Sequence, residues 1–198
     1  MRTAEIKRKT KETDISLKLT LEGGERKIDT GIGFFDHMLN SFAVHSGFGL
    51  TLTCKGDLEV DGHHSVEDCG IALGQALAQC VGDKAGIARF GQAFVPMDEA
   101  LGFCALDISG RPYLVFDAPM PQPMCGQYDT CLTVEFMRAL APQVLVRRER
   151  APYHRGAVQG ACTRAQAGRC SYRRRRFERE GRSLTVCCNG EWKMENGE

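Results

Sequence analysis

The sequence predicts an α+β fold of two similar sheet-plus-helix halves, of which the second is incomplete or atypical. In residues 1–90, alternating apolar segments and apolar stripes at helical spacing follow in the order strand, strand, helix, strand, strand, helix. The same order begins again in residues 91–141 and stops after one helix, which indicates an approximate internal repeat. Residues 142–198 show no sustained periodicity, so we expect a basic, aperiodic tail there.

The first half begins with a strand in which apolar and polar residues alternate from Ile15 to Leu21. Gly23 and Gly24 then favour a turn, and residues 26–29 are expected to return as the hairpin partner of that strand. The remaining elements expected in this half are a helix from about 34 to 44, strands at 50–54 and 58–60, and a helix from 63 that ends at Gly82.

The second half is expected to contain strands at 93–97, 102–108 and 113–116, with a turn at 109–112. A helix follows, capped by Asp129 or Thr130. Its buried face would comprise Leu132, Phe136 and Leu140, which lie four residues apart.

The composition is typical of a soluble globular protein, with 42% hydrophobic and 26% charged residues among 198. No apolar run is long enough to span a bilayer, and residues 1–5 lack the pattern of a secretory signal, so we expect a cytoplasmic protein. Three of the ten cysteines, Cys69, Cys80 and Cys104, occupy apolar positions of predicted elements. They are expected to be buried, reduced thiols.

The segment Asp61–Asp68 carries the strongest chemical pattern in the chain. Adjacent His63 and His64 precede Glu67 by four and three residues, offsets that share one face of a helix. Imidazole and carboxylate together suit a divalent ion such as Mn, Zn, Fe or Co. An apolar stripe behind them would hold the helix in place. The alternative is that the two histidines are a solvated helix cap.

Four motifs, in this order, closely resemble the imidazoleglycerol-phosphate dehydratase family of histidine biosynthesis. They are Gly33–Leu39, Asp61–Asp68, Pro96–Ala100 and Ser109–Leu114. The resemblance extends over residues 1 to about 141. It implies a ribosomal S5 domain 2-like fold, two Mn²⁺ ions per site shared between subunits, and a 24-subunit particle built from trimers. It also implies a small phosphate substrate as the partner, with neither a membrane nor a nucleic acid.

The resemblance also implies a set of site residues. The metal ligands would be His37, His63, His64, Glu67 and Glu135, and the residues around the substrate would be Glu12, His45, Arg89 and Arg111. Glu12 and Glu67 would be the catalytic carboxylates, Glu67 also being a metal ligand.

The reaction removes water from imidazole glycerol phosphate to give imidazole acetol phosphate, and it suits these residue types. A divalent ion on the ring nitrogens can stabilise an imidazolate as a carbon proton leaves. A carboxylate such as Glu12 can move that proton, and the two arginines can hold the phosphate dianion.

Taken alone, four of these residues have simpler interpretations. His45 could cap the end of a helix, where a cation is favoured. Arg111 in a turn could be a solvated charge, and the Arg89 stem could cover apolar surface. Glu12, within a Lys-rich run, could be an ordinary surface acid.

The tail departs from the family. Residues 143–198 hold thirteen of the 26 Lys and Arg residues, and they lack the second His-His-x-x-Glu motif and the Ser-Lys-Gly type phosphate segment. A one-base shift of a GC-rich back-translation of residues 154–170 can encode an amphipathic helix of the family's kind. Our hypothesis is that residues 143–198 are out of frame. Two alternatives remain, an inactive relative that binds one metal weakly and, through Arg173–Arg176, a basic-tailed nucleic-acid-binding protein.

Overall fold

The computed structural model describes residues 1–144, 177–179, 182–186 and 192–195. The chain divides into two compact units, residues 1–168 and 169–198, and each is described by itself. Among the described residues, no helix has the length and apolar character needed to cross a membrane.

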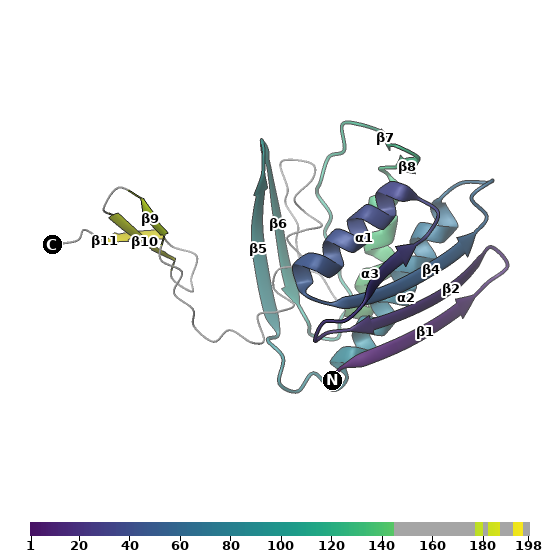
Figure 1. Cartoon of the computed structure of the whole chain (residues 1–198), viewed down its shortest axis with the longest axis horizontal. Helices are drawn as coiled ribbons and strands as arrows, with labels where there is room; N and C mark the ends of the chain where they lie inside the picture. Colours follow the sequence, from purple (N-terminus) through teal and green to yellow (C-terminus); the bar gives the residue numbers. More distant parts are fainter. Residues whose placement is uncertain (145–176, 180–181, 187–191, 196–198) are drawn as a thin grey trace. The chain divides into compact units, whose positions relative to one another are not determined.

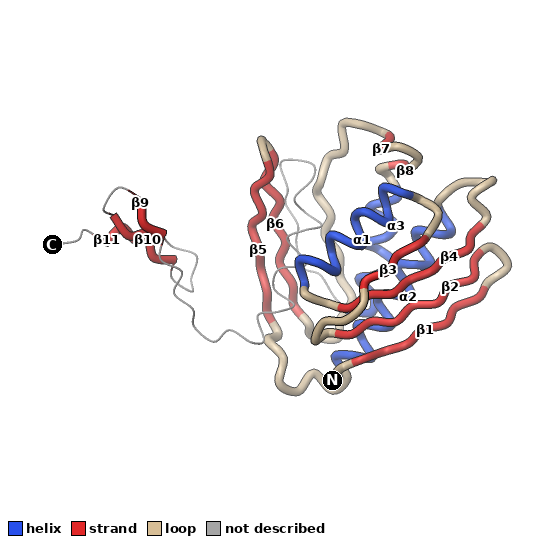
Figure 2. Tube along the Cα trace, in the orientation of Figure 1, coloured by secondary structure: helices blue, strands red, loops and turns tan. Residues whose placement is uncertain are grey.

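The first half contains a four-stranded sheet with the strand order β1-β2-β4-β3 (Figure 1). The strands are β1 (Thr3–Lys9), β2 (Thr13–Thr20), β3 (Arg26–Asp29) and β4 (Gly49–Gly56). Buried and exposed side chains alternate along β2, so one face of the sheet is covered and the other is open. Figure 2 shows the helices of this half on the covered face. The predicted strands in β2 and β4 are confirmed.

The predicted hairpin between β2 and β3 is wrong. β2 pairs antiparallel with β1, where Leu17 is opposite Ile6, and also with β4. β3 instead pairs in parallel with β4, where Ile28 is opposite Leu52. A parallel pair needs a crossover, and the intervening helix α1 (Gly33–Ser46) provides it.

Two short predicted strands are also absent. Residues 58–60 form a turn, in which the Val60 amide donates to the Asp57 carbonyl at 2.8 Å. Val60 is 68% exposed, so its apolar side chain is not part of a core strand. Residues 113–116 run without strand pairing, and Tyr113 is 62% exposed.

Two helices of the first half fill the covered face of the sheet, α1 (Gly33–Ser46) and α2 (His63–Val81). Gly47 ends α1 in a left-handed conformation, and Gly82 follows the last residue of α2 as predicted. More than half of the α2 residues are buried, because the helix packs against β1 and β2 on one side and against α3 (Leu132–Val144) on the other. The most deeply buried core side chains are Ile15, Leu17, Leu19, Leu50, Leu52, Val66, Cys69 and Leu73.

The second half begins with an antiparallel pair, β5 (Phe90–Met97) and β6 (Ala100–Asp107). The short strands β7 (Met124–Cys125) and β8 (Tyr128–Asp129) precede α3 (Leu132–Val144). These elements confirm the predicted strands at 93–97 and 102–108 and the helix after Thr130. Cys69, Cys80 and Cys104 are buried thiols that take part in no disulfide, also as predicted.

The unit of residues 169–198 contains three described strands that the sequence patterns did not predict. They are β9 (Phe177–Arg179), β10 (Arg182–Val186) and β11 (Trp192–Glu195). They form an antiparallel sheet with β10 in the middle.

The contact between α2 and α3 depends on Gly70. A Cβ atom at this position would lie 2.8 Å from the Phe136 carbonyl oxygen and 2.9 Å from the Ala139 Cβ. The two helices therefore approach each other at Gly70 more closely than a side chain at that position would allow. Aromatic stacking extends this contact to α1, since Phe35 lies 5.4 Å from Phe136 and 5.9 Å from Tyr128, between ring centroids.

We expect Gly70→Ala to lower the free energy of unfolding by about 1–3 kcal/mol, because the new methyl group overlaps backbone that cannot move freely. The measurement is urea unfolding followed by circular dichroism. Gly33→Ala is the matched control, since Gly33 also lies in a helix and a Cβ there would have no neighbour within 4 Å. An equal effect of both substitutions would contradict the close packing at Gly70.

Candidate metal and substrate site

The candidate site begins at the first turn of α2, which contains both adjacent histidines. The Asp61 carboxylate accepts a hydrogen bond from the His63 amide at 2.7 Å and so caps the start of the helix. The side chains of His63 and His64 are each 43% exposed, and that of Glu67 is 45% exposed. All three are therefore open to a ligand from outside the helix.

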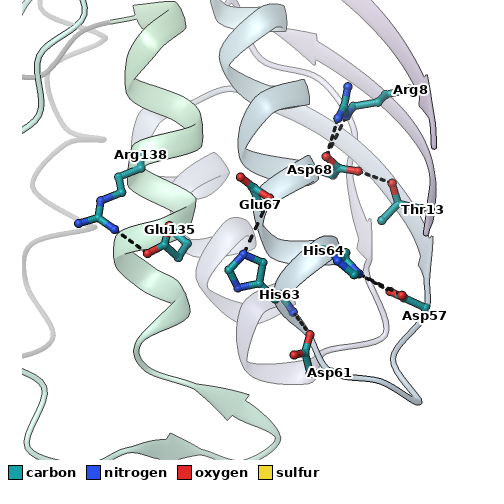
Figure 3. Close-up of polar contacts among 10 residues, drawn as sticks. All are labelled: Arg8, Thr13, Asp57, Asp61, His63, His64, Glu67, Asp68, Glu135 and Arg138. Carbon is teal, nitrogen blue, oxygen red and sulfur yellow. Dashed lines mark hydrogen bonds and ion pairs between the residues drawn. The ribbon is translucent and has the colours of Figure 1, made fainter. Parts of the chain in front are cut away.

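The two histidines point to different sides of α2 (Figure 3). The Nε2 atom of His63 lies 3.9 Å from a Glu67 carboxylate oxygen. The Nδ1 atom of His64 instead lies 3.0 Å from Asp57, and the two imidazole planes are 85° apart. Consecutive helical residues are separated by about 100° around the axis, which explains this divergence. The ring of His63 thus lies near the Glu67 carboxylate, as the spacing predicts, whereas the ring of His64 turns toward Asp57.

His64 lies in an acidic environment. The hydrogen bond that the His64 ring donates to Asp57 is the largest of the effects that raise the pKa of His64, and the negative charges of Asp57, Glu12 and Asp61 raise it further, while desolvation opposes them. Glu12, in the turn between β1 and β2, is therefore close enough to act on the His64 ring. On this side of α2 the carboxylate in direct contact with the His64 ring is that of Asp57.

The other side of α2 faces the start of α3. Glu135 in the first turn of α3 accepts a hydrogen bond from Arg138 at 2.7 Å and lies on the His63 side of α2 (Figure 3). The pKa of the Cys131 thiol is raised, first by its hydrogen bond with Asp129, then by desolvation, and further by the charges of Asp129, Glu135 and Asp61. Charges from the starts of both helices thus act on one thiol.

Asp68 fixes the position of α2 on the sheet. Its buried carboxylate accepts hydrogen bonds from Arg8 at 2.7 and 3.0 Å and from the Thr13 hydroxyl at 2.5 Å. Arg8 belongs to β1 and Thr13 to β2, so a single side chain ties the helix to two strands. Asp68, the residue next to Glu67, is therefore held in place by its contacts with β1 and β2.

Comparisons with known proteins decide the family of this chain. The family model described as imidazoleglycerol-phosphate dehydratase matches residues 30–147. The imidazoleglycerol-phosphate dehydratase of Streptococcus sanguinis strain SK36 is 60% identical over 142 residues, covering 71% of this chain and 73% of the relative. The enzyme of that name from Desulforudis audaxviator is 56% identical over 142 residues, with 71% and 72% covered. This chain belongs to the imidazoleglycerol-phosphate dehydratase family.

Solved structures agree with this assignment. The crystal structure of imidazoleglycerol-phosphate dehydratase from Staphylococcus aureus N315 has a TM-score of 0.71 and 29% identity, covering 82% of this chain and 95% of that chain. The Pyrococcus furiosus enzyme in complex with (S)-C348 has a TM-score of 0.67 and 30% identity, with 81% and 90% covered. The predicted α+β fold of two sheet-plus-helix halves is therefore confirmed. Enzymes of this family are carbon–oxygen lyases of histidine biosynthesis.

The remaining residues that the family resemblance implies are dispersed over several elements. His37 and His45 are exposed on α1, and Arg111 is exposed after β6. Arg89 already has a partner, because its guanidinium donates to Asp107 at 2.8 Å and lies over the Phe90 ring. Within residues 1–144 and the described strands of the tail, no group of three His, Cys, Asp or Glu side chains is arranged to hold a metal ion.

Sequence reasoning missed Asp57 and Asp68 as residues that act on the site. The sequence patterns give Asp57 no role, and Asp68 belongs to the Asp61–Asp68 motif without a role of its own. The acidic residue directly after Glu67 was the available signal for Asp68, since a charge on the buried face of a helix needs a partner. No local signal identified Asp57, whose partner lies seven residues further along the chain.

We expect the His64 ring of the metal-free chain to titrate above its ordinary value of 6.5, and Asp57→Asn to lower that midpoint. A histidine pKa raised by folding stabilises the native state below the unfolded pKa, and this contribution is lost as pH rises through the folded pKa. Asp57→Asn should therefore cost more stability at pH 5 than at pH 8. NMR titration and urea unfolding at both pH values are the measurements. A midpoint that Asp61→Asn lowers as much as Asp57→Asn would contradict the direct contact.

Proposed function

We propose that this chain is a manganese-dependent imidazoleglycerol-phosphate dehydratase that converts imidazole glycerol phosphate to imidazole acetol phosphate in the cytoplasm. The observation that carries the proposal is the family match together with the first turn of α2, where His63, His64 and Glu67 are exposed side by side. A nucleic acid or membrane partner forms no part of it.

The donor chemistry of this turn fits a divalent metal of intermediate softness. His63 and Glu67 are one helical turn apart with their side chains 3.9 Å from each other, so one ion could accept both. His64, turned to the other side, would serve a second ion, which agrees with two Mn²⁺ per site. A bound ion would supply stabilisation of negative charge on the substrate imidazole.

Glu12 is proposed as the residue that moves the proton. It is exposed in the β1–β2 turn, and its negative charge acts on the His64 ring, which supports this role. Glu67 would contribute as a ligand. Arg111 is exposed for the phosphate group, whereas Arg89 would have to exchange Asp107 for the phosphate.

A homo-oligomer is part of this proposal. The two ligand groups point to different sides of α2, and the described residues of one chain supply too few donors to complete either ion (Figure 3). His37 and Glu135 would complete the metal sites, and His45 would contribute to the substrate site, when copies of the chain assemble as trimers that build a 24-subunit particle.

We expect Glu12→Gln to lower kcat of the full-length chain by about 10²–10⁴-fold, because general acid–base groups contribute on this scale. Manganese affinity should change little, since Glu12 is not assigned as a ligand. Glu5→Gln is the matched control: Glu5 is another exposed acid of the same sheet, paired with Lys18 at 2.8 Å. Steady-state kinetics measures kcat, and isothermal titration with Mn²⁺ measures the manganese affinity. A similar loss of kcat in both variants would remove Glu12 from the mechanism.

A second candidate is an inactive relative that binds one metal weakly. It is favoured by the missing second His-His-x-x-Glu motif and by the extent of the similarity, which leaves about a quarter of the Streptococcus relative outside the match. Weak manganese binding, no turnover and a monomer or trimer by light scattering would support this candidate. Turnover by a large particle would exclude it.

The reading frame of residues 143–198 can be tested separately. We propose that these residues are out of frame, which is supported by the end of the family match at residue 147 and the change of composition near that point. Resequencing the coding DNA should reveal a one-base insertion or deletion near codon 142, and its correction should restore the missing motif. An intact frame would overturn this hypothesis. A salt-dependent shift of DNA or RNA by the purified chain would then support a role for Arg173–Arg176, which lies outside the described residues.

A further inference from the structure

We propose that Asp57 is a positioning residue that holds the His64 ring with its Nδ1 atom protonated and its Nε2 lone pair free for a metal ion. The inference rests on the proposed function in one respect, the role of His64 as a ligand. Asp57 belongs to none of the motifs that identify the family in this sequence. It comes from the turn after β4, outside α2.

The contact itself defines which ring nitrogen carries the proton. The His64 Nδ1 atom lies 3.0 Å from one Asp57 carboxylate oxygen and 3.2 Å from the other. A carboxylate has only acceptor oxygens, so the nitrogen must be the donor. In the neutral ring the remaining nitrogen, Nε2, then carries the lone pair. Histidines that bind metals generally donate their second ring N–H to a carboxylate or carbonyl in this way.

The fold places Asp57 at this position through two local features. Gly56, the last residue of β4, has no side chain, and a Cβ atom there would overlap the Ser65 hydroxyl. The end of β4 can therefore approach the first turn of α2. The Val60 amide then donates to the Asp57 carbonyl at 2.8 Å, which closes the turn and fixes the Asp57 backbone. The Asp57 side chain is only 20% exposed, compared with 43% for His64.

The other carboxylates near this turn have different partners. Asp61 accepts from the His63 amide, and Asp68 accepts from Arg8 and Thr13. Glu67 lies 3.9 Å from the His63 ring, beyond hydrogen-bonding distance. Figure 3 shows these contacts separately around α2, with Asp57 on the side of His64. Asp61→Asn therefore removes a nearby charge while keeping the cap acceptor and leaving the His64 contact intact.

The experiment uses the full-length chain and two readouts. The first is the ¹⁵N chemical shifts of the His64 ring in metal-free protein above its titration midpoint, assigned with His64→Gln. The second is Mn²⁺ affinity by isothermal titration. The variants are Asp57→Ala, Asp57→Asn and the control Asp61→Asn, each checked for folding by circular dichroism and its thermal midpoint.

In the wild-type chain we expect a protonated Nδ1 and an unprotonated Nε2. Asp57→Ala should abolish this preference and weaken Mn²⁺ binding by about 10–100-fold, the effect typical of losing such a contact. Asp57→Asn keeps an acceptor oxygen, so it should retain the tautomer and lose less affinity. Asp61→Asn should retain the tautomer and most of the affinity.

The results separate this inference from the proposed function. A wild-type His64 protonated on Nε2 would overturn the role of Asp57. Equal losses of Mn²⁺ affinity in Asp57→Ala and Asp61→Asn would also overturn it. The loss would then come from removing a negative charge near His64 and not from removing the contact with Nδ1. A wild-type chain with the expected tautomer that binds no Mn²⁺ would overturn the metal assignment, while the orientation of the ring by Asp57 would stand.

Discussion

The buried carboxylate of Asp68 is the interaction on which the site depends. It joins α2 to β1 through Arg8 and to β2 through Thr13, at distances of 2.5–3.0 Å. Hydrogen bonds to a charged group contribute about 1.5–3 kcal/mol each when they are shielded from water. Arg8 is partly exposed, so its share falls toward the lower end of that range. The main consequence is geometric, because the first two turns of α2 cannot rotate or slide along the sheet.

A second constraint acts on the opposite side of the same helix. At Gly70 the backbone of α3 approaches α2 so closely that no side chain fits between them. Asp68 and Gly70 are two residues apart and lie on different faces of α2, toward the sheet and toward α3. The helix is thus fixed from both sides just after Glu67. His63, His64 and Glu67 remain exposed, yet the backbone that supports them is rigid, which suits a metal site.

The sequence predicted the elements of the first half better than their pairing. The stripe that includes Val66, Cys69 and Leu73 predicted α2 correctly, because helical periodicity reflects burial on one face. β1 was missed because only Ala4 and Ile6 of its seven residues are buried, which is too weak an alternation among charged residues. The hairpin between β2 and β3 was wrong for another reason. The Gly23–Gly24 turn favours pairing between the two strands that it joins, β2 and β3. In the structure β4 pairs with β2 along eight residues and takes the place beside β2 that β3 would need.

The candidate site shows the same division between local and tertiary information. Residue types and spacing identified His63, His64 and Glu67, since these depend only on one helix. The direction of each ring did not follow from the spacing, because it depends on Asp57, which is brought to His64 by the packing of Gly56 against Ser65. Likewise, the pairing of Arg89 with Asp107 across β5 and β6 could not be derived from the family motif.

The different directions of the two histidine rings determine which metal binding would be lost in the absence of the second His-His-x-x-Glu motif. His63 and His64 point to different sides of α2, so on the proposed metal assignment each would serve a different ion. His63 has a carboxylate neighbour in Glu67, whereas the carboxylate neighbour of His64, Asp57, contacts its Nδ1 atom and would leave only Nε2 for an ion. Without donors from a second half or another copy, the His63 side would retain two ligands and the His64 side one. Loss of the second motif should therefore abolish binding on the His64 side first and leave a weak single site at His63 and Glu67.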